Sequence, residues 1–538
     1  MGAPTAFYHL VDIQEASRWA TDFLCKEVSP SNISYLIQYW KIRKYDVNWS
    51  IQINIDDLKQ YYQSFNRGRE FEWKEKLGND LNWALSFDHL KEKDTTKHVH
   101  RLHPYKGKFI PQLVEYFLDD HIDEFKTASF FAKGNIILDP FSGSWTTLIQ
   151  AHELGMHSIG IDVSHFNCLI TESKITDYDL NLLIQEITHL KKKIENFEAE
   201  NNLDDFEKEL NCKLSEFNNK FFPSPQFKRE VYTKKVNEDS FWKEKEAEFL
   251  SIYTSLVQKY NIQLYQEKNH NFLDKWYVKN TRDEIDFALK ELKKVKDKKI
   301  KKILAIILSR TVRSCRATTH SDLATLKTPQ LTTYYCFKHK KICKPLFSIK
   351  QRFSRYANDT IKRIKEFSKL KTETFWAILC ADSRNVDIFE EIKATNVEFF
   401  NLIKKQKIRG IFSSPPYIGQ IDYHEQHAYA YDLFWLERHD ELEIWPLYKG
   451  HGNVARESYV EGITQVLLNA RKFMIDDFDV FLVANDKRGV YPKIAEKSWM
   501  KIVNQYKRPV LNRTECDKNP YSEIIFHLKN NCSKTWIT

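Results

Sequence analysis

Apolar residues recur at helical spacing near the start of the chain. In "EASRWATDFLCKE" they fall at positions 16, 19, 20 and 23, which places them on one side of a helix. The next stretch, "VSPSNISYLIQYW", predicts a second short helix with Ser29 or Ser31 as its N-cap and with apolar residues turned inward. Two helices separated by so tight a turn suggest a helix-turn-helix.

Polar and apolar residues alternate in the stretch that comes next. "SIQINI", residues 50–55, predicts a small β-wing, and another helix is expected to begin near Asp56. Over roughly residues 10–65, this arrangement resembles the winged helix-turn-helix of MerR- and excisionase-type DNA-binding modules. A small helical packing module without DNA contacts is the alternative interpretation. In the DNA-binding interpretation, the exposed face of the second helix meets base edges through Ser31, Asn32, Ser34, Tyr35 and Gln38.

A strand, a turn, a helix and a second strand are predicted between residues 134 and 164. In "GNIILDPFSGSWTTLIQAHELGMHSIGIDVS" the first apolar run ends at Asp139, and Gly143 lies in the turn before a helix that starts near Thr146. The second run ends at Asp162, which lies 19 residues after Gly143, the spacing at which an acid reaches ribose hydroxyls. The pattern fits a dinucleotide or S-adenosylmethionine, and a purely structural turn is the alternative.

Two later apolar runs also end in polar residues. Asp382 ends "AILCAD", and Ser414 follows the run "IRGIFS". Ligands of open α/β sheets bind outside the carboxyl ends of the strands, so these residues are expected to converge with Asp139 and Asp162 on one crevice.

Long, Lys-rich helical segments interrupt this alternation between residues 165 and 370, and the strand pattern resumes at "FWAILCADSRNV". The middle of the chain is therefore interpreted as an insertion into an α/β domain. The predicted segments are a winged helix-turn-helix over residues 1–65, the two parts of the α/β domain over 66–164 and 373–538, and the helical insertion over 165–372.

Composition narrows the class of protein. The chain has 538 residues, 42% of them hydrophobic and 14% aromatic, which is enough for two or three packed domains. A formal net charge of +9 permits binding to a polyanion, although a Lys-rich genomic bias gives the same charge. The nine scattered cysteines, with no signal peptide and no apolar run of membrane-spanning length, predict a reduced, cytoplasmic protein.

Four short motifs then carry a family resemblance. "DPFSGSWTT", "GIDVS", "ADSR" and "SSPPY", in this order, resemble motifs I to IV of the S-adenosylmethionine-dependent DNA amino-methyltransferases, which methylate N4 of cytosine or N6 of adenine. The resemblance implies a Rossmann-like methyltransferase fold, S-adenosylmethionine as cofactor and double-stranded DNA as partner. In this family SPPY favours cytosine N4, whereas DPPY favours adenine N6. The chain has no Pro-Cys dipeptide, which disfavours methylation at cytosine C5.

The same resemblance implies the cofactor site. "HPYKGKFIPQL" resembles motif X, which closes over the methionine end of the cofactor. Trp145 stands where the family usually has glycine, so we expect it to stack over the cofactor or partly fill its site. The implied cofactor-binding residues are Lys108, Phe109, Pro111, Asp139, Phe141, Gly143, Ser144, Thr146, Asp162 and Asp382.

The double proline of "SSPPY" is expected to build the base pocket. A base inside a duplex must be swung out before its amino group can reach a methyl donor. Pro415 and Pro416 lack N–H donors and fix a stiff turn whose carbonyls are free to accept hydrogen bonds. The resemblance implies that Ser414 and the Pro415 carbonyl hold the amino group, that Tyr417 stacks on the base, and that transfer is direct and in line, without a covalent enzyme intermediate.

Cysteine and histidine clusters suggest further sites. "YYCFKHKKICKP" places Cys336, His339 and Cys343 at a spacing that suits a small zinc knuckle, with Cys315 or His320 as candidate fourth ligand. "HVHRLH" supplies three more histidines without a nearby acid or cysteine, so they are interpreted as structural or phosphate-facing. They are His98, His100 and His103.

The sequence therefore predicts a DNA (cytosine-N4) methyltransferase of a restriction-modification or related defence system, with a cognate restriction endonuclease as a candidate partner. The helical insertion, where basic residues alternate with aromatic and hydroxyl residues, is the candidate target-recognition region. An adenine-N6 methyltransferase, an RNA base methyltransferase and a non-catalytic DNA-binding regulator are the alternatives.

Overall fold

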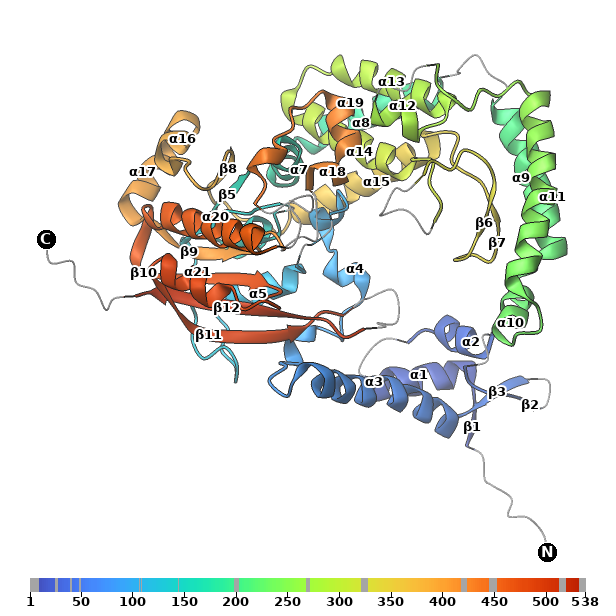
Figure 1. The fold of residues 1–538 in the computed structure, drawn as a ribbon, viewed down its shortest axis with the longest axis horizontal. Helices are drawn as coiled ribbons and strands as arrows, with labels where there is room; N and C mark the ends of the chain where they lie inside the picture. Colours follow the sequence, from blue (N-terminus) through green and yellow to red (C-terminus); the bar gives the residue numbers. More distant parts are fainter. Residues whose placement is uncertain are drawn as a thin grey trace, which may run out of the picture.

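The structure is a computed structural model. It describes residues 9–24, 28–38, 41–47, 50–105, 107, 109–143, 145–197, 203–267, 271–320, 328–417, 423–444, 452–511 and 519–531, without the side chains of residues 38, 46–47 and 63–69. Within these residues the strands form sheets of three, seven and two strands. The seven-stranded sheet is the centre of the α/β domain (Figure 1).

The N-terminal module consists of two short helices packed on a small antiparallel sheet. Its strands pair in the order β1-β3-β2. Apolar residues from both helices and from the sheet, among them Ala16, Ile33 and Ile53, form one core. The elements are β1 (Leu10–Asp12), α1 (Ile13–Leu24), α2 (Pro30–Gln38), β2 (Lys44–Val47) and β3 (Ser50–Asn54).

Ser29, rather than Ser31, is the N-cap of the second helix. The Ser29 hydroxyl oxygen accepts from the backbone N–H of Asn32 at 3.3 Å, and Asn32 Oδ1 accepts from the backbone N–H of Ser29 at 2.9 Å. Such reciprocal bonds fix the start of a helix. Strand β3 then leads directly into α3 (Ile55–Leu77), so the predicted helix near Asp56 is confirmed.

The seven-stranded sheet has the order β11-β12-β10-β9-β4-β5-β8. The strands β10, β9, β4, β5 and β8 are parallel, and β12 runs antiparallel to both of its neighbours. The antiparallel pair β11 and β12 forms one edge of the sheet. The strands are β4 (Ile136–Asp139), β5 (His157–Asp162), β8 (Trp376–Cys380), β9 (Ile408–Ser413), β10 (Met474–Ala484), β11 (Met500–Pro509) and β12 (Ser522–Asn530).

Helices cover both faces of this sheet. Ile136 and Leu138 of β4 pack into a core with α16, α17, α20 and α21, whereas Ile137 packs on the opposite face with α5 and the segment around α6. This alternation is what a strand buried on both sides produces. These helices are α5 (Pro111–Leu118), α6 (Thr146–Glu153), α16 (Ile388–Thr395), α17 (Val397–Gln406), α20 (Asn453–Arg471) and α21 (Tyr491–Lys497).

The insertion has a body that shares a core with the α/β domain. Ile149 of α6 and Phe166 of α7 belong to the same apolar cluster as Ile187 and Ile307 of the insertion helices. The clustered elements are α7 (His165–Ile175), α8 (Leu180–Glu195), α12 (Phe272–Trp276), α13 (Lys279–Lys293), α14 (Lys298–Ser314), α15 (Lys350–Phe367) and α19 (Ala428–Phe434). Because this core is continuous, the body is held rigidly beside the sheet.

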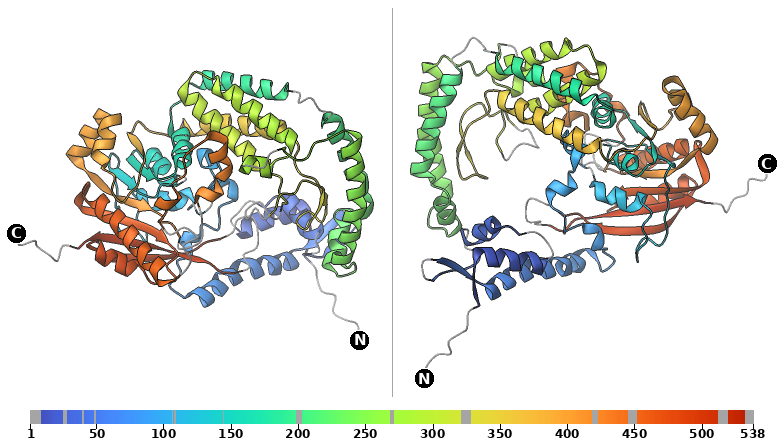
Figure 2. Two further views of the ribbon diagram at one scale, coloured as in Figure 1. Left: turned by 45° about the horizontal axis from the view of Figure 1, so that its top comes forward. Right: turned by 180° about the vertical axis from the view of Figure 1, so that it is seen from behind.

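The rest of the insertion forms an arm that returns to the N-terminal module. The arm contacts the module through α10, where Lys41 Nζ lies 5.3 Å from the centre of the Tyr232 ring. Figures 1 and 2 show the resulting closed path, which runs from the module through α3, the α/β domain, the insertion body and the arm. The arm consists of α9 (Leu203–Phe221), α10 (Gln226–Tyr232) and α11 (Glu238–Lys259), with a small hairpin of β6 (Tyr334–Cys336) and β7 (Lys341–Cys343) packed on it.

The three histidines of "HVHRLH" are all buried, which excludes the phosphate-facing role. His103 Nε2 lies 3.2 Å from Ser309 Oγ of α14, so this histidine joins the two parts of the shared core. The structure also brings an acid that sequence spacing did not reveal, because His98 Nε2 lies 2.8 Å from Glu153 Oε1. The short elements between α3 and α5 are η1 (Ala84–Ser86), α4 (Glu92–Thr95) and η2 (His98–Arg101).

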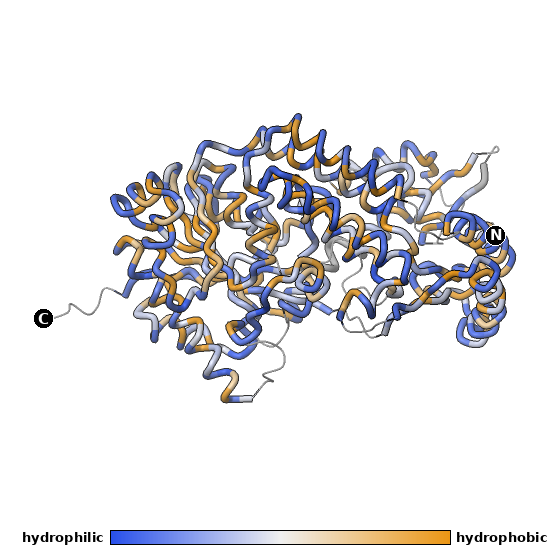
Figure 3. Tube along the Cα trace, turned by 90° about the horizontal axis from the view of Figure 1, so that it is seen from above, coloured by the Kyte–Doolittle hydropathy of each residue, from blue (hydrophilic) through white to orange (hydrophobic). Residues whose placement is uncertain are grey.

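Hydropathy follows this arrangement. In Figure 3, hydrophobic and hydrophilic residues alternate along the helices, as amphipathic helices require. Among the residues that the structure describes, no helix has both the length and the apolar character needed to cross a membrane.

Candidate functional site

A cleft opens at the carboxyl ends of the parallel strands. The chain order of the strands reverses between β4 and β9, since β5 and β8 follow on one side of β4 while β9 and β10 lie on the other. Such reversals are where open α/β sheets bind ligands. The cleft has about 910 Å³ of free space, counting the solvent at its mouth.

Nine of the predicted site residues line this one cleft. They come from the ends of β4, β5, β8 and β9 and from the segments before α5 and α6, so the predicted convergence of four strand ends is confirmed. The nine are Phe109, Asp139, Phe141, Gly143, Thr146, Asp162, Asp382, Ser414 and Pro416.

The remaining predicted residues lie elsewhere. Pro111 is buried as the first residue of α5, and Pro415 is buried beside the cleft without lining it. Tyr417 is also absent from the lining, and its hydroxyl donates to Glu523 Oε1 of β12 at 2.5 Å. Lys108 and Ser144 lie outside the described residues.

Asp139 ties the two central strands together at the floor of the cleft. Its Oδ1 accepts a hydrogen bond from Ser413 Oγ, the last residue of β9, at 2.6 Å. The same oxygen accepts from the backbone N–H of Phe141 at 3.2 Å. The carboxyl is only 2% exposed, and this burial raises its pKa from 3.8 to about 6 although the hydrogen bonds oppose the shift.

Asp162 holds the turn between β4 and α6. Its Oδ2 accepts from the backbone N–H of Gly143 at 2.8 Å, and Gly143 has a positive φ of 44°. This conformation favours glycine, and a Cβ at Gly143 would lie 2.9 Å from the hydroxyl oxygen of Tyr105, which would have to shift. Burial raises the pKa of Asp162 to about 6, against hydrogen bonds from Ser164, Asn167 and Gly143.

Asp382 is held by its neighbour Arg384 at the end of β8. The guanidinium donates to both carboxylate oxygens, from Nε at 2.9 Å and from an Nη atom at 2.6 Å. This bidentate pair fixes the carboxylate plane against the cleft. "ADSR" thus supplies both the acid and the group that orients it.

Trp145 does not occupy the cleft, contrary to expectation. Its side chain is fully buried and lies across β5, where a Cβ at Gly160 would come within 2.3 Å of a ring carbon. Trp145 itself has a positive φ of 65°, which turns its side chain away from the cleft and onto the sheet. The glycine at position 160 is what makes room for the indole.

Sequence reasoning missed several residues that line the cleft. His424 of α18 (Tyr423–Gln426) and Glu443, just after η3 (Asp440–Leu442), form a buried hydrogen-bonded pair there. Asn167 Nδ2 reaches Asp162 from α7 at 3.2 Å. Tyr105 could have been predicted, because it belongs to "HPYKGKF", the segment that resembles motif X. The His424–Glu443 pair could not, because neither residue lies in a recognisable motif.

The second helix of the N-terminal module exposes its predicted polar face. Ser31, Asn32, Ser34 and Tyr35 are all exposed, and Tyr35 keeps 54% of its accessible surface. Asn32 serves partly as the cap partner of Ser29. Gln38 ends the helix, and its side chain is not described.

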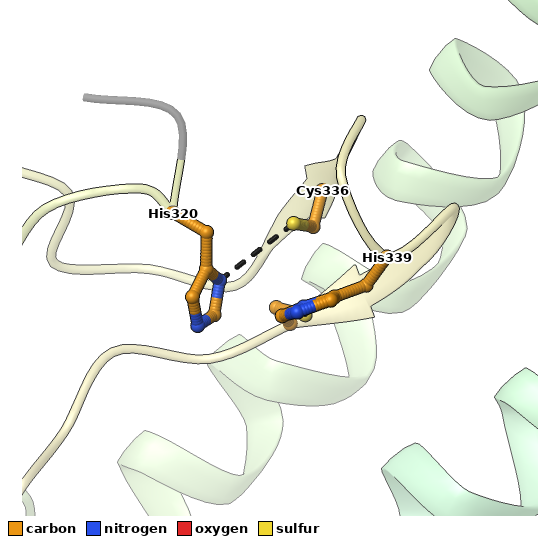
Figure 4. Close-up of side chains that lie close together, drawn as sticks. His320, Cys336 and His339 are labelled. Atoms are coloured by element: carbon orange, nitrogen blue, oxygen red, sulfur yellow. Dashed lines mark hydrogen bonds between the residues drawn. The ribbon is translucent and has the colours of Figure 1, made fainter. Parts of the chain in front are cut away.

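The cysteine and histidine residues of the insertion also converge. Cys336, His339 and Cys343 of the β6–β7 hairpin lie with His320 in one group (Figure 4). Cys315, the other candidate, is buried elsewhere, with its sulfur facing the backbone oxygen of Ser348.

The raised pKa of Asp139 predicts how stability depends on pH. The folded protein retains this proton between the unfolded value of 3.8 and about 6, so the contribution of Asp139 to stability falls as pH rises through this window. We expect the melting temperature of the wild-type protein, relative to Asp139→Asn, to fall by a few °C between about pH 4.5 and 7. Differential scanning calorimetry of both proteins measures this, and a difference that rises with pH would contradict the assignment.

Comparison with known proteins extends these observations. The sequence matches the DNA methylase family over residues 25–173, which include β4, β5 and the turn between them. No solved structure is significantly similar to the chain.

Two relatives match short segments. The type II methyltransferase M.MvaI of Kocuria varians is 28% identical over 116 residues, or 22% of this chain and 24% of that protein. M.BsoBI of Geobacillus stearothermophilus, also a type II methyltransferase, is 36% identical over 96 residues, or 18% and 17%.

A third relative matches almost from end to end. The type II methyltransferase M.MjaII of Methanocaldococcus jannaschii is 48% identical over 524 residues, which are 97% of both proteins. The match therefore spans the N-terminal module, the insertion and both parts of the α/β domain. With this identity along nearly its whole length, and with the cleft that its motifs build, the chain belongs to the family of type II DNA methyltransferases.

Proposed function

We propose that the protein transfers a methyl group from S-adenosylmethionine to N4 of cytosine at a specific site in duplex DNA. The observation that carries this proposal is the cleft itself, where three strand-end carboxylates meet Ser414 and Pro416 of SPPY. A cofactor site and a base pocket must share one cavity if the methyl group is to pass directly between them.

The cleft residues suit the cofactor. Phe141 offers apolar surface for an adenine ring, Phe109 offers it for the methionine end, and the three acids offer acceptors for hydroxyl and amino groups. A carboxylate has about four acceptor positions, so Asp162 retains capacity for a ribose hydroxyl beside its bonds to Gly143, Ser164 and Asn167. Asp382 is assigned to the adenine end, and Asp139, Gly143 and Thr146 to the methionine end. S-adenosylmethionine, when bound, supplies an electrophilic methyl group.

The SPPY segment is assigned to the target base. Ser414 and the Pro415 carbonyl would accept from the exocyclic amino group and orient its nitrogen toward the methyl carbon. Neither Pro415 nor Pro416 has an N–H that could compete as a donor. Tyr417 follows directly, and its bond to Glu523 fixes the hydroxyl end of a ring on which the extruded base is expected to stack.

The N-terminal module is proposed to bind DNA as a winged helix-turn-helix, with α2 presenting Ser31, Asn32, Ser34, Tyr35 and Gln38. Its two helices, its antiparallel strands and the exposed face of α2 support this proposal. The arm that touches the module would keep it at a set distance from the cleft, so that recognition and methylation occur on one duplex. As a type II enzyme, the protein is proposed to act beside a cognate restriction endonuclease.

The base pocket is tested by the product. We expect wild-type protein incubated with S-adenosylmethionine and mixed genomic DNA to form N4-methylcytosine, identified by nucleoside digestion and mass spectrometry. Tyr417→Ala should lower kcat/KM by about 5- to 150-fold, the equivalent of the roughly 1–3 kcal/mol that stacking on one base supplies. Tyr417→Phe keeps the ring, loses the bond to Glu523 and should remain within a few-fold of wild type.

Each other product identifies a rival. Detection of N6-methyladenine would leave the proposed cofactor site unchanged and identify adenine as the target base, because one residue of motif IV carries most of that distinction. Methylation of RNA in preference to DNA would identify the protein as an RNA base methyltransferase. Absence of both transfer and cofactor binding would leave a DNA-binding regulator.

The N-terminal module is tested by DNA affinity. Tyr35→Ala should weaken binding of a cognate duplex about tenfold, by analogy with the cost of losing one good base contact. Tyr265→Ala removes a comparably exposed tyrosine of the insertion and serves as the control. Fluorescence anisotropy measures both, and equal affinities for Tyr35→Ala and wild type would contradict the assignment of α2.

A further inference from the structure

Four side chains of the kinds that ligate metals lie together in the insertion, outside the methyltransferase cleft. His320, Cys336, His339 and Cys343 each offer one ligand atom, and these atoms all lie within 4.8 Å of one another. None of the four lines the cleft. Figure 4 shows Cys336 and His339 of the hairpin and His320 of a separate segment facing one another.

The distances fit a tetrahedral zinc ion. Zinc bonds of about 2.3 Å to sulfur and 2.0–2.1 Å to nitrogen, at the tetrahedral angle, place the two ligand atoms about 3.6 Å apart. Cys336 Sγ lies 3.6 Å from His320 Nδ1, and Cys343 Sγ lies 3.6 Å from His339 Nδ1. The rings of His320 and His339 are 4.4 Å apart between centroids. Two separate thiol–imidazole hydrogen bonds explain each 3.6 Å contact alone, but not the convergence of all four side chains.

The local backbone builds this arrangement. The turn between β6 and β7 is closed by a hydrogen bond from Lys340 N to Cys336 O at 2.6 Å, and Lys340 has a positive φ of 53°. This turn places Cys336 and Cys343 on paired strands, with His339 at the tip. The Tyr334 hydroxyl accepts from the His320 backbone N–H at 3.2 Å, which positions the fourth residue. The same hydroxyl lies 2.8 Å from His320 Nδ1, and this hydrogen bond is replaced when Nδ1 binds the ion.

We propose that His320, Cys336, His339 and Cys343 bind one structural zinc ion. Four protein ligands leave no open position for a substrate, as in structural rather than catalytic zinc sites. The described residues hold a second such group, formed by His98, His100 and Glu153. Its carboxylate, Glu153, already pairs with the Lys97 ammonium at 2.8 Å, so this acid is neutralised by a side chain rather than by a metal ion.

The ion would clasp the arm to the insertion body. The hairpin is bonded to the arm, because Asn218 of α9 exchanges two hydrogen bonds with the backbone of Ile342 and Glu246 of α11 accepts from the backbone N–H of Tyr335. His320 belongs instead to the segment that leaves α14, a helix of the body. Zinc between them joins the two parts of the insertion where the two-stranded hairpin alone is too small to be stable.

Metal content tests this proposal. We expect the purified full chain to contain about one zinc per molecule by inductively coupled plasma mass spectrometry. Cys336→Ser and His320→Asn should each lose most of it, whereas Cys212→Ser, at an exposed cysteine of α9, and Cys315→Ser should retain it. Equal zinc in Cys336→Ser and wild type would overturn the assignment, as would its absence from wild type after reconstitution with zinc chloride.

A second measurement covers variants that fail to fold. Wild-type protein stripped by a chelator and reloaded with Co²⁺ should show the visible absorption of tetrahedral cobalt together with thiolate-to-cobalt charge transfer. A reloaded protein without these bands, or a Cys336–Cys343 disulfide found by mass spectrometry in protein purified under reducing conditions, would overturn the proposal. Both readouts are independent of methyl transfer, so failure of the zinc site and failure of the proposed activity are distinguishable.

Discussion

The reversal of strand order between β4 and β9 is the constraint on which the rest of the molecule depends. At that point the loops that follow two neighbouring parallel strands run in opposite directions across the sheet. The space between these two loops is the cleft. The hydrogen bond from Ser413 to Asp139 closes the floor of the cleft across the two strands. It places a buried carboxyl at the floor of the cleft that we propose as the site of the positively charged sulfonium cofactor.

The larger parts of the chain are arranged around this cleft, and α7 contributes Asn167 to its lining. The insertion body is fixed to the sheet through the shared core, and the arm carries that rigidity outward to the N-terminal module. A methyltransferase that reads a sequence needs its base pocket at a defined distance from its recognition surface. The closed path of the chain in Figures 1 and 2 would supply such a distance if the N-terminal module is, as proposed, the recognition surface.

Local pattern predicted the elements whose signals are short in sequence. The strand ends near Asp139, Asp162 and Asp382 follow from apolar runs that stop at an acid. Contacts between distant segments were beyond reach, because no spacing rule links Tyr417 to Glu523 or His424 to Glu443. The prediction for Trp145 was wrong for a different reason. The direction of its side chain depends on a positive φ at Trp145 and on a glycine in the neighbouring strand, Gly160. The division into four segments remains a prediction.

Binding of S-adenosylhomocysteine, the product form of the cofactor, tests the central claim most directly. Isothermal titration of wild type, Asp382→Ala and the control Asp476→Ala, whose carboxylate lies at the opposite end of the sheet, separates the cleft from the rest of the domain. The account predicts one site per chain in wild type and in the control, and binding weaker by about tenfold or more in Asp382→Ala, the cost of one hydrogen bond to a charged group. No binding to wild type, or equal binding by all three proteins, would contradict it.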